Sequence, residues 1–122
     1  MSKLYQPIKN NPYRLRDSVY RWTVTAIRDV GKVEAGYYDA DYLQEYKPTS
    51  AVIEAVNTAL REVPEEYRRV VFDNTAFETA LPAGYRSKAT TLEKAKFIYR
   101  VAELLGYPLG ANKIITVIYD WR

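Results

Sequence analysis

The chain contains no cysteine and no histidine among its 122 residues. Without cysteine there are no disulfides, zinc–thiolate sites or thiol nucleophiles. Without histidine there is no histidine-ligated haem and no Ser–His–Asp arrangement. A metal would be held by carboxylates alone, which suits magnesium or calcium better than zinc. We therefore expect a protein that is not an enzyme and that uses no cofactor.

Long apolar runs are missing as well. No stretch approaches the roughly 20 residues of a membrane-spanning helix, and no signal-peptide pattern opens the sequence, so we expect a cytoplasmic protein with no membrane partner. Hydrophobic residues make up 48% of the chain, enough for the core of one domain without disulfides. The net charge of +3 permits nucleic acid binding but does not require it.

Helical periodicity dominates the sequence. Apolar residues recur at steps of three and four over residues 15–30, and Gly31 is the expected end of this helix. A second helix is predicted over residues 50–63, capped by Thr49 and Ser50. These patterns, together with two further helices, predict an all-α fold, a small helical domain of four or five helices.

A third helix is expected to begin at Pro64, because proline is well tolerated at a first helical position. Glu65 and Glu66 then fall in the first turn, where carboxylates complement the helix dipole. This explanation is preferred over acid–base catalysis by an adjacent pair of carboxylates. The expected inner face of the helix comprises Tyr67, Val70, Val71, Asn74 and Phe77.

A fourth helix is predicted over residues 90–105, after a loop that contains proline and glycine. Thr90 and Glu93 have the spacing of a capping box at its start, and Gly106 suits its end. Five basic residues fall within the fifteen residues that end at Arg100, opposed only by Glu93: Arg86, Lys88, Lys94, Lys96 and Arg100. They indicate either a solvated amphipathic helix or a helix that meets an acidic partner.

The chain divides into four parts within a single domain over residues 1–122. Residues 1–12 are expected to form an extended arm, residues 13–48 the first helix and a Tyr-rich linker, and residues 49–107 a helix-turn-helix-like region. Residues 108–122 form a tail for which a strand and a last short helix both remain open.

The linker over residues 33–48 is acidic and rich in tyrosine. Asp39, Asp41 and Glu45 lie close together there, but they lack the glycine and distal glutamate of a calcium loop, so we expect no metal site. Twelve tyrosines in the whole chain are many, and tyrosine is common both in half-buried positions and on binding surfaces. These features allow one function that does not involve DNA, that of a protein-interaction module.

Part of the chain resembles small phage-encoded transcriptional activators of the RinA/ArpU type, which are common in prophages of Gram-positive bacteria. The resemblance covers roughly residues 18–107 and rests on VPEEYRRVVFDNTAF, LPAGYRSKATTLEKAKFIYRVAELLGY and the upstream SVYRWTVTAIRDV. Two features depart from the family: the linker after the first helix is shorter than the family's variable middle, and the tail after Gly106 is longer.

The resemblance implies a helix-turn-helix similar to region 4 of sigma factors, with residues 90–105 as the recognition helix. The protein would then regulate phage genes, as an activator of late genes, inside a bacterial host cell. The implied partners are double-stranded DNA, host RNA polymerase and, as an open alternative, a second copy of the chain. The expected DNA-binding residues are Arg68, Arg69, Arg86, Lys88, Thr91, Lys94, Lys96 and Arg100.

Overall fold

The computed structural model describes residues 12–109. Regular structure within these residues is entirely helical, which confirms the expected all-α class. The α-helices are α1 (Asp17–Glu34), α2 (Ser50–Glu62), α3 (Glu65–Phe77) and α4 (Lys88–Leu104). Three short 3-10 helices lie between them, η1 (Tyr37–Asp39), η2 (Asp41–Tyr46) and η3 (Ala83–Tyr85). The expected arm and tail fall almost wholly outside the described residues.

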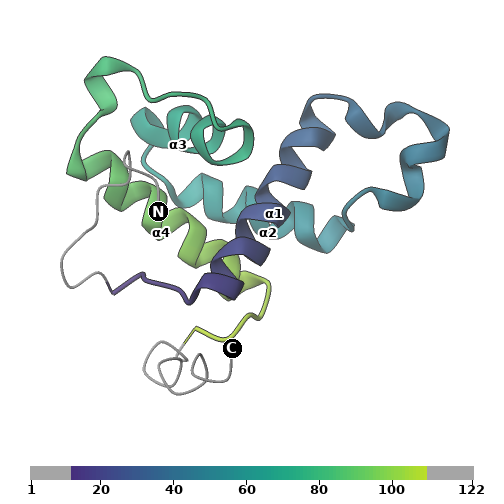
Figure 1. Ribbon diagram of the computed structural model, residues 1–122, viewed down its shortest axis with the longest axis horizontal. Helices are drawn as coiled ribbons and strands as arrows, with labels where there is room; N and C mark the ends of the chain where they lie inside the picture. Colours follow the sequence, from purple (N-terminus) through teal and green to yellow (C-terminus); the bar gives the residue numbers. More distant parts are fainter. Residues whose placement is uncertain (1–11, 110–122) are drawn as a thin grey trace.

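The four α-helices pack around one core, and each of them contacts the other three (Figure 1). Their buried side chains form a single hydrophobic cluster, consistent with amphipathic helices that cover one another's apolar faces. The most deeply buried members of the cluster are Val19, Ile27, Val56, Ala59, Val71, Phe72, Phe97, Val101 and Ala102. The turn between α3 and α4 lies at one end of the long axis, and the loop that carries η1 and η2 lies at the other.

The first helix continues past Gly31, which the sequence predicted as its end. A Cβ atom at this position would lie 2.9 Å from the Cβ of Ala76 and 3.1 Å from the ring of Phe77. Gly31 is therefore a buried point of close approach between α1 and α3. The helix ends at Glu34, and Gly36, with a φ of 79°, provides the left-handed residue after it.

The third helix begins at Glu65, one residue later than predicted, with Pro64 as its N-cap. Its buried face is also different from the predicted one, because the helix packs against both α1 and α4. Phe72 is buried although it was not predicted to be, whereas Phe77 was expected inside and is 44% exposed. The buried residues of this helix are Val71, Phe72, Thr75 and Ala76.

The fourth helix begins at Lys88, two residues before the predicted start. The hydroxyl of Ser87 accepts a hydrogen bond from the backbone N–H of Thr90, at 3.4 Å, so Ser87 is the N-cap. Thr90 lies in the second half of the first turn and is 1% exposed, while Glu93 lies 3.9 Å from Lys96. The predicted capping box of Thr90 and Glu93 is therefore wrong.

Candidate nucleic-acid interface

The outer side of α4 carries a basic stripe near its beginning. Lys88, Leu92 and Lys96 are each four residues apart, so they project from the same side of the helix. Both lysines are exposed, and Leu92 is half-buried between them. Thr91 flanks the stripe, and its hydroxyl donates a hydrogen bond to the carbonyl oxygen of Ser87 at 3.1 Å.

Arg86 extends this basic surface into the turn before the helix. Its Nε donates a hydrogen bond of 3.0 Å to the carbonyl oxygen of Leu81, which orients an otherwise exposed guanidinium. The sequence has no acidic residue between Glu78 and Glu93. We use the term α4 face for Arg86, Lys88, Thr91 and Lys96.

The start of α4 differs in charge from the starts of α1 and α3. Asp17 lies in the first turn of α1, and Glu65 and Glu66 lie in that of α3, where they complement the positive end of the helix dipole. The first turn of α4 contains no acid and begins with Lys88. A cation there destabilises a helix by about 0.3–1 kcal/mol, whereas a bound anion would be favoured.

Lys94, which the sequence places among the DNA contacts, is directed to α3 instead of the α4 face. Its Nζ donates a hydrogen bond of 2.7 Å to Oδ1 of Asn74 on α3, and Nδ2 of Asn74 donates to the carbonyl oxygen of Thr79 at 2.8 Å. Burial lowers the pKa of Lys94, and the positive charge of Arg28 lowers it further against the opposing effect of Glu78. Lys94 therefore positions the turn between α3 and α4.

Arg68 and Arg69, expected to contact phosphates from α3, have partners within the protein. Arg68 Nη2 donates to the carbonyl oxygens of Arg61 and Val63, both at 3.0 Å, and so satisfies carbonyls at the end of α2. Arg69 forms ion pairs of 3.0 Å with Glu34 of α1 and with Asp73, and its hydrogen bond to Glu34 is the main cause of its raised pKa.

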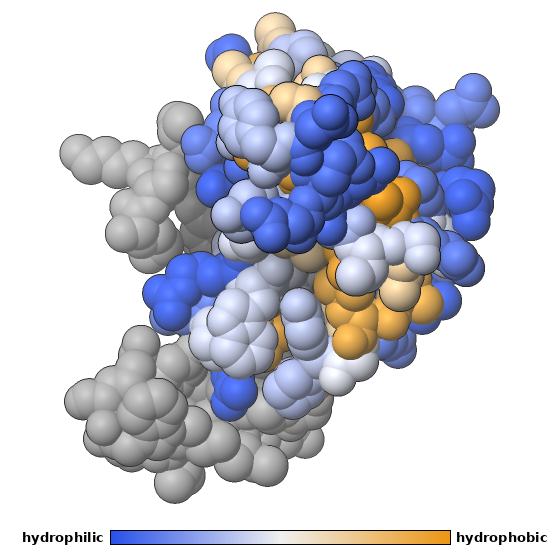
Figure 2. Space-filling view, turned by 90° about the vertical axis from the view of Figure 1, so that its right-hand side faces the viewer, coloured by the Kyte–Doolittle hydropathy of each residue, from blue (hydrophilic) through white to orange (hydrophobic). Residues whose placement is uncertain are grey.

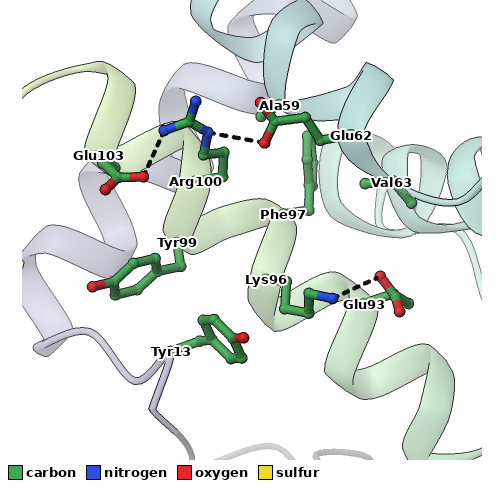
Figure 3. A pocket seen from close by; sticks show the side chains of 10 residues that line it. All are labelled: Tyr13, Ala59, Glu62, Val63, Glu93, Lys96, Phe97, Tyr99, Arg100 and Glu103. Carbon is green, nitrogen blue, oxygen red and sulfur yellow. Dashed lines mark hydrogen bonds and ion pairs between the residues drawn. The ribbon is translucent and has the colours of Figure 1, made fainter.

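Arg100 is likewise engaged, at the rim of a pocket of about 250 Å³ between α2 and α4 (Figure 3). It donates to Glu62 at 2.9 Å and to Glu103 at 2.6 Å, and these two hydrogen bonds raise its pKa. The dashed lines in Figure 3 show that the guanidinium is directed to these two carboxylates. Arg100 therefore joins α4 to α2, and its assignment to the DNA-binding residues stays a prediction.

Four of the eight predicted residues form the α4 face, where Arg86, Thr91 and Lys96 also have local partners within the protein. The other four contact a neighbouring helix or its end. Leu92 and Ala95 are partly buried and lie on α4 beside the lysines. Leu92 lies four residues from both Lys88 and Lys96, and Ala95 lies four residues from Thr91. This spacing could have identified them in the sequence as neighbours of the basic side chains.

Within residues 12–109, no group of three or more acidic side chains is arranged to hold a metal ion. None of the helices described is long and apolar enough to cross a membrane. Comparison of the chain with protein-family models, with curated proteins and with solved structures gives no match.

Proposed function

We propose that the protein is a DNA-binding transcriptional regulator that reads duplex DNA with the α4 face. The observation that carries this proposal is the position of Lys88 and Lys96 on one exposed side of α4, next to Arg86. Lys88 stands where the helix dipole disfavours a cation, and a phosphate group would reverse that effect. The resemblance to RinA/ArpU-type activators supports the same function and suggests phage late genes as targets.

The α4 face divides naturally between the two kinds of DNA contact. Arg86 and Lys88 lie in and next to the turn, where basic side chains of DNA-binding domains commonly contact phosphates. Thr91 and Lys96 lie further along the helix, where they would reach base edges in the major groove. Leu92 and Ala95 lie between them and offer apolar contact to a thymine methyl group.

The turn of this domain is longer than that of a simple helix-turn-helix. Residues 78–87 separate α3 from α4, whereas the simplest motif uses about three or four residues. The link from Lys94 through Asn74 to the carbonyl of Thr79 compensates, because it holds the beginning of the turn against both helices. A long turn can therefore still present Arg86 at a defined position.

A single domain makes few contacts, so we propose that two copies bind two half-sites. Small domains of this kind usually recognise operators in which the half-sites are about one helical turn apart. The number of protected half-sites in a footprint of the protein on its own genomic region would measure this directly.

The test is a binding titration against duplex DNA at several salt concentrations. We expect the double variant Lys88→Ala, Lys96→Ala to bind more weakly and to reduce the slope of log K against log[salt] by about 1, since Lys88 is assigned a phosphate contact and Lys96 a base contact, and each lost phosphate contact reduces the slope by about 0.9. The matched control is Lys32→Ala, Lys47→Ala, which removes the same charge from α1 and the distant loop. An equal loss in both double variants would contradict the proposed site, because it would reflect net charge alone.

A further inference from the structure

The loop between α1 and α2 exposes three aromatic side chains. Tyr37, Tyr42 and Tyr46 are 50%, 77% and 66% exposed. We call residues 35–48 the aromatic loop. It lies at the end of the long axis opposite to the turn before α4 (Figure 1). Exposed tyrosines of this kind, apolar in the ring and polar at the hydroxyl, are enriched in protein interfaces.

The aromatic loop is held in place by its own buried residue. Tyr38 is 5% exposed, and its burial, with smaller contributions from Asp29 and Tyr37, raises the pKa of its hydroxyl. Nε2 of Gln44 donates a hydrogen bond to the carbonyl oxygen of Tyr38, which joins η2 to η1. The exposed rings are therefore presented by an anchored support, which reduces the entropy lost when a partner binds.

The charge of the loop selects the chemistry of that partner. Asp39, Asp41 and Glu45 are all exposed, and no basic residue occurs between Lys32 and Lys47. Among residues 12–109, none of these three carboxylates takes part in an ion pair. Their field repels nucleic acids and anionic membranes and attracts a cationic protein surface.

The arrangement of the side chains favours arginine. In a 3-10 helix, residues three apart eclipse each other, so Tyr42 and Glu45 project from the same side of η2. A guanidinium can lie on an aromatic ring and pair with a neighbouring carboxylate at the same time, which the compact ammonium of lysine does less well. A cation already lies over one ring of the loop, because Nζ of Lys32 is 5.1 Å from the ring centroid of Tyr37.

We propose that the aromatic loop docks an arginine-bearing segment of another protein, with a guanidinium lying on Tyr42 and paired with Glu45. Figure 2 views this end of the molecule and shows apolar and weakly polar side chains gathered between hydrophilic ones, as expected of a contact surface. The loop and the α4 face lie at opposite ends, so both can be occupied together. The proposal does not require the α4 face to bind DNA.

In the experiment, an alanine-rich helical peptide that carries several arginines is titrated into the full chain. Binding is measured from the changes in the protein's amide chemical shifts in NMR spectra. We expect the shifts to change within the aromatic loop and affinity to fall roughly fivefold in Tyr42→Ala and in Glu45→Gln, the size of one exposed cation–π contact or ion pair. Tyr42→Phe keeps the ring and should keep the affinity. Glu65→Gln on α3 is the matched control, because it removes an exposed carboxylate away from the loop.

Three results would overturn the proposal: shift changes outside the aromatic loop, equal weakening by Glu65→Gln and Glu45→Gln, or equal affinity for the peptide with lysines in place of arginines. Measuring the binding of duplex DNA by the same protein sample tests the DNA-binding proposal separately from the docking proposal. Peptide binding without DNA binding would leave the docking proposal standing alone, and DNA binding without peptide binding would leave only the regulator.

Discussion

Lys94 of α4 donates a hydrogen bond to Asn74 of α3, with 2.7 Å between Nζ and Oδ1. Asn74 in turn donates to the carbonyl oxygen of Thr79, so one amide group joins α3, α4 and the turn between them. A lysine that the sequence places among the DNA contacts therefore acts within the fold. The position of the α4 face depends on this connection.

Removal of the Lys94 side chain should destabilise the protein. We expect Lys94→Ala to lower the free energy of unfolding by about 1–3 kcal/mol, because Asn74 Oδ1 loses its partner in a partly buried site. Urea denaturation measures the change. Lys96→Ala, on the exposed stripe of the same helix, should change stability by no more than about 0.5 kcal/mol. Equal effects of the two substitutions would contradict the structural role of Lys94.

Lys94 should also make stability depend on pH in alkaline solution. Its folded-state pKa lies below the ordinary value of 10.5, so between these two values the unfolded chain binds more protons than the folded one. Stability contributed by this group therefore rises as pH increases through that window. The free energy of unfolding of the wild type and of Lys94→Met, measured between about pH 8 and 10.5, isolates the contribution of Lys94, because Tyr38 is present in both proteins. If the two free energies changed with pH in parallel, this prediction would be contradicted.

Gly31 should not tolerate a side chain, although it lies inside a helix. Alanine is normally favoured over glycine there by about 1 kcal/mol, but its Cβ would lie 2.9 Å from that of Ala76. We expect Gly31→Ala to be destabilising by about 1–3 kcal/mol because of this overpacking. Gly84→Ala is the matched control, with nothing within 4 Å of the new Cβ, and should be neutral or stabilising. Thermal unfolding of both variants measures these changes in stability, and equal effects of the two substitutions would contradict the close packing at Gly31.

Ser87, not Thr90, should determine the start of α4. Ser87→Ala removes the hydroxyl that accepts from the backbone N–H of Thr90 and should be destabilising by about 1 kcal/mol. Glu93→Gln should have little effect, because Glu93 takes no part in the cap. Urea denaturation measures both variants. A larger loss in the free energy of unfolding for Glu93→Gln than for Ser87→Ala would support the capping box predicted from the sequence instead.

Arg100 should have no role in DNA binding. Its guanidinium is directed to Glu62 and Glu103, so we expect Arg100→Gln to leave the affinity for duplex DNA and its salt dependence within about twofold of the wild type. The same titration with Lys88→Ala provides the positive comparison. A loss of DNA affinity in Arg100→Gln as large as in Lys88→Ala would contradict this prediction and add Arg100 to the α4 face.

The sequence by itself determined the all-α class and the four α-helices found within residues 12–109, because their signals are local. The best predicted element is α2: Thr49 lies just before the apolar pattern, and its hydroxyl accepts from the backbone N–H of Val52 at 3.4 Å. A cap and a helical period each depend on side chains within a few residues, so they can be read without knowledge of the fold.

Only the tertiary structure decided which glycine ends α1 and which basic residues remain available. Gly31 is explained by Ala76 on another helix, and Arg69 is engaged by Glu34, which lies 35 residues before it in the chain. A helical wheel shows which side of a helix a charge occupies, but it does not show where a distant carboxylate, amide or methyl group will pack against that side. The α4 face therefore became definable only once the four helices were packed together.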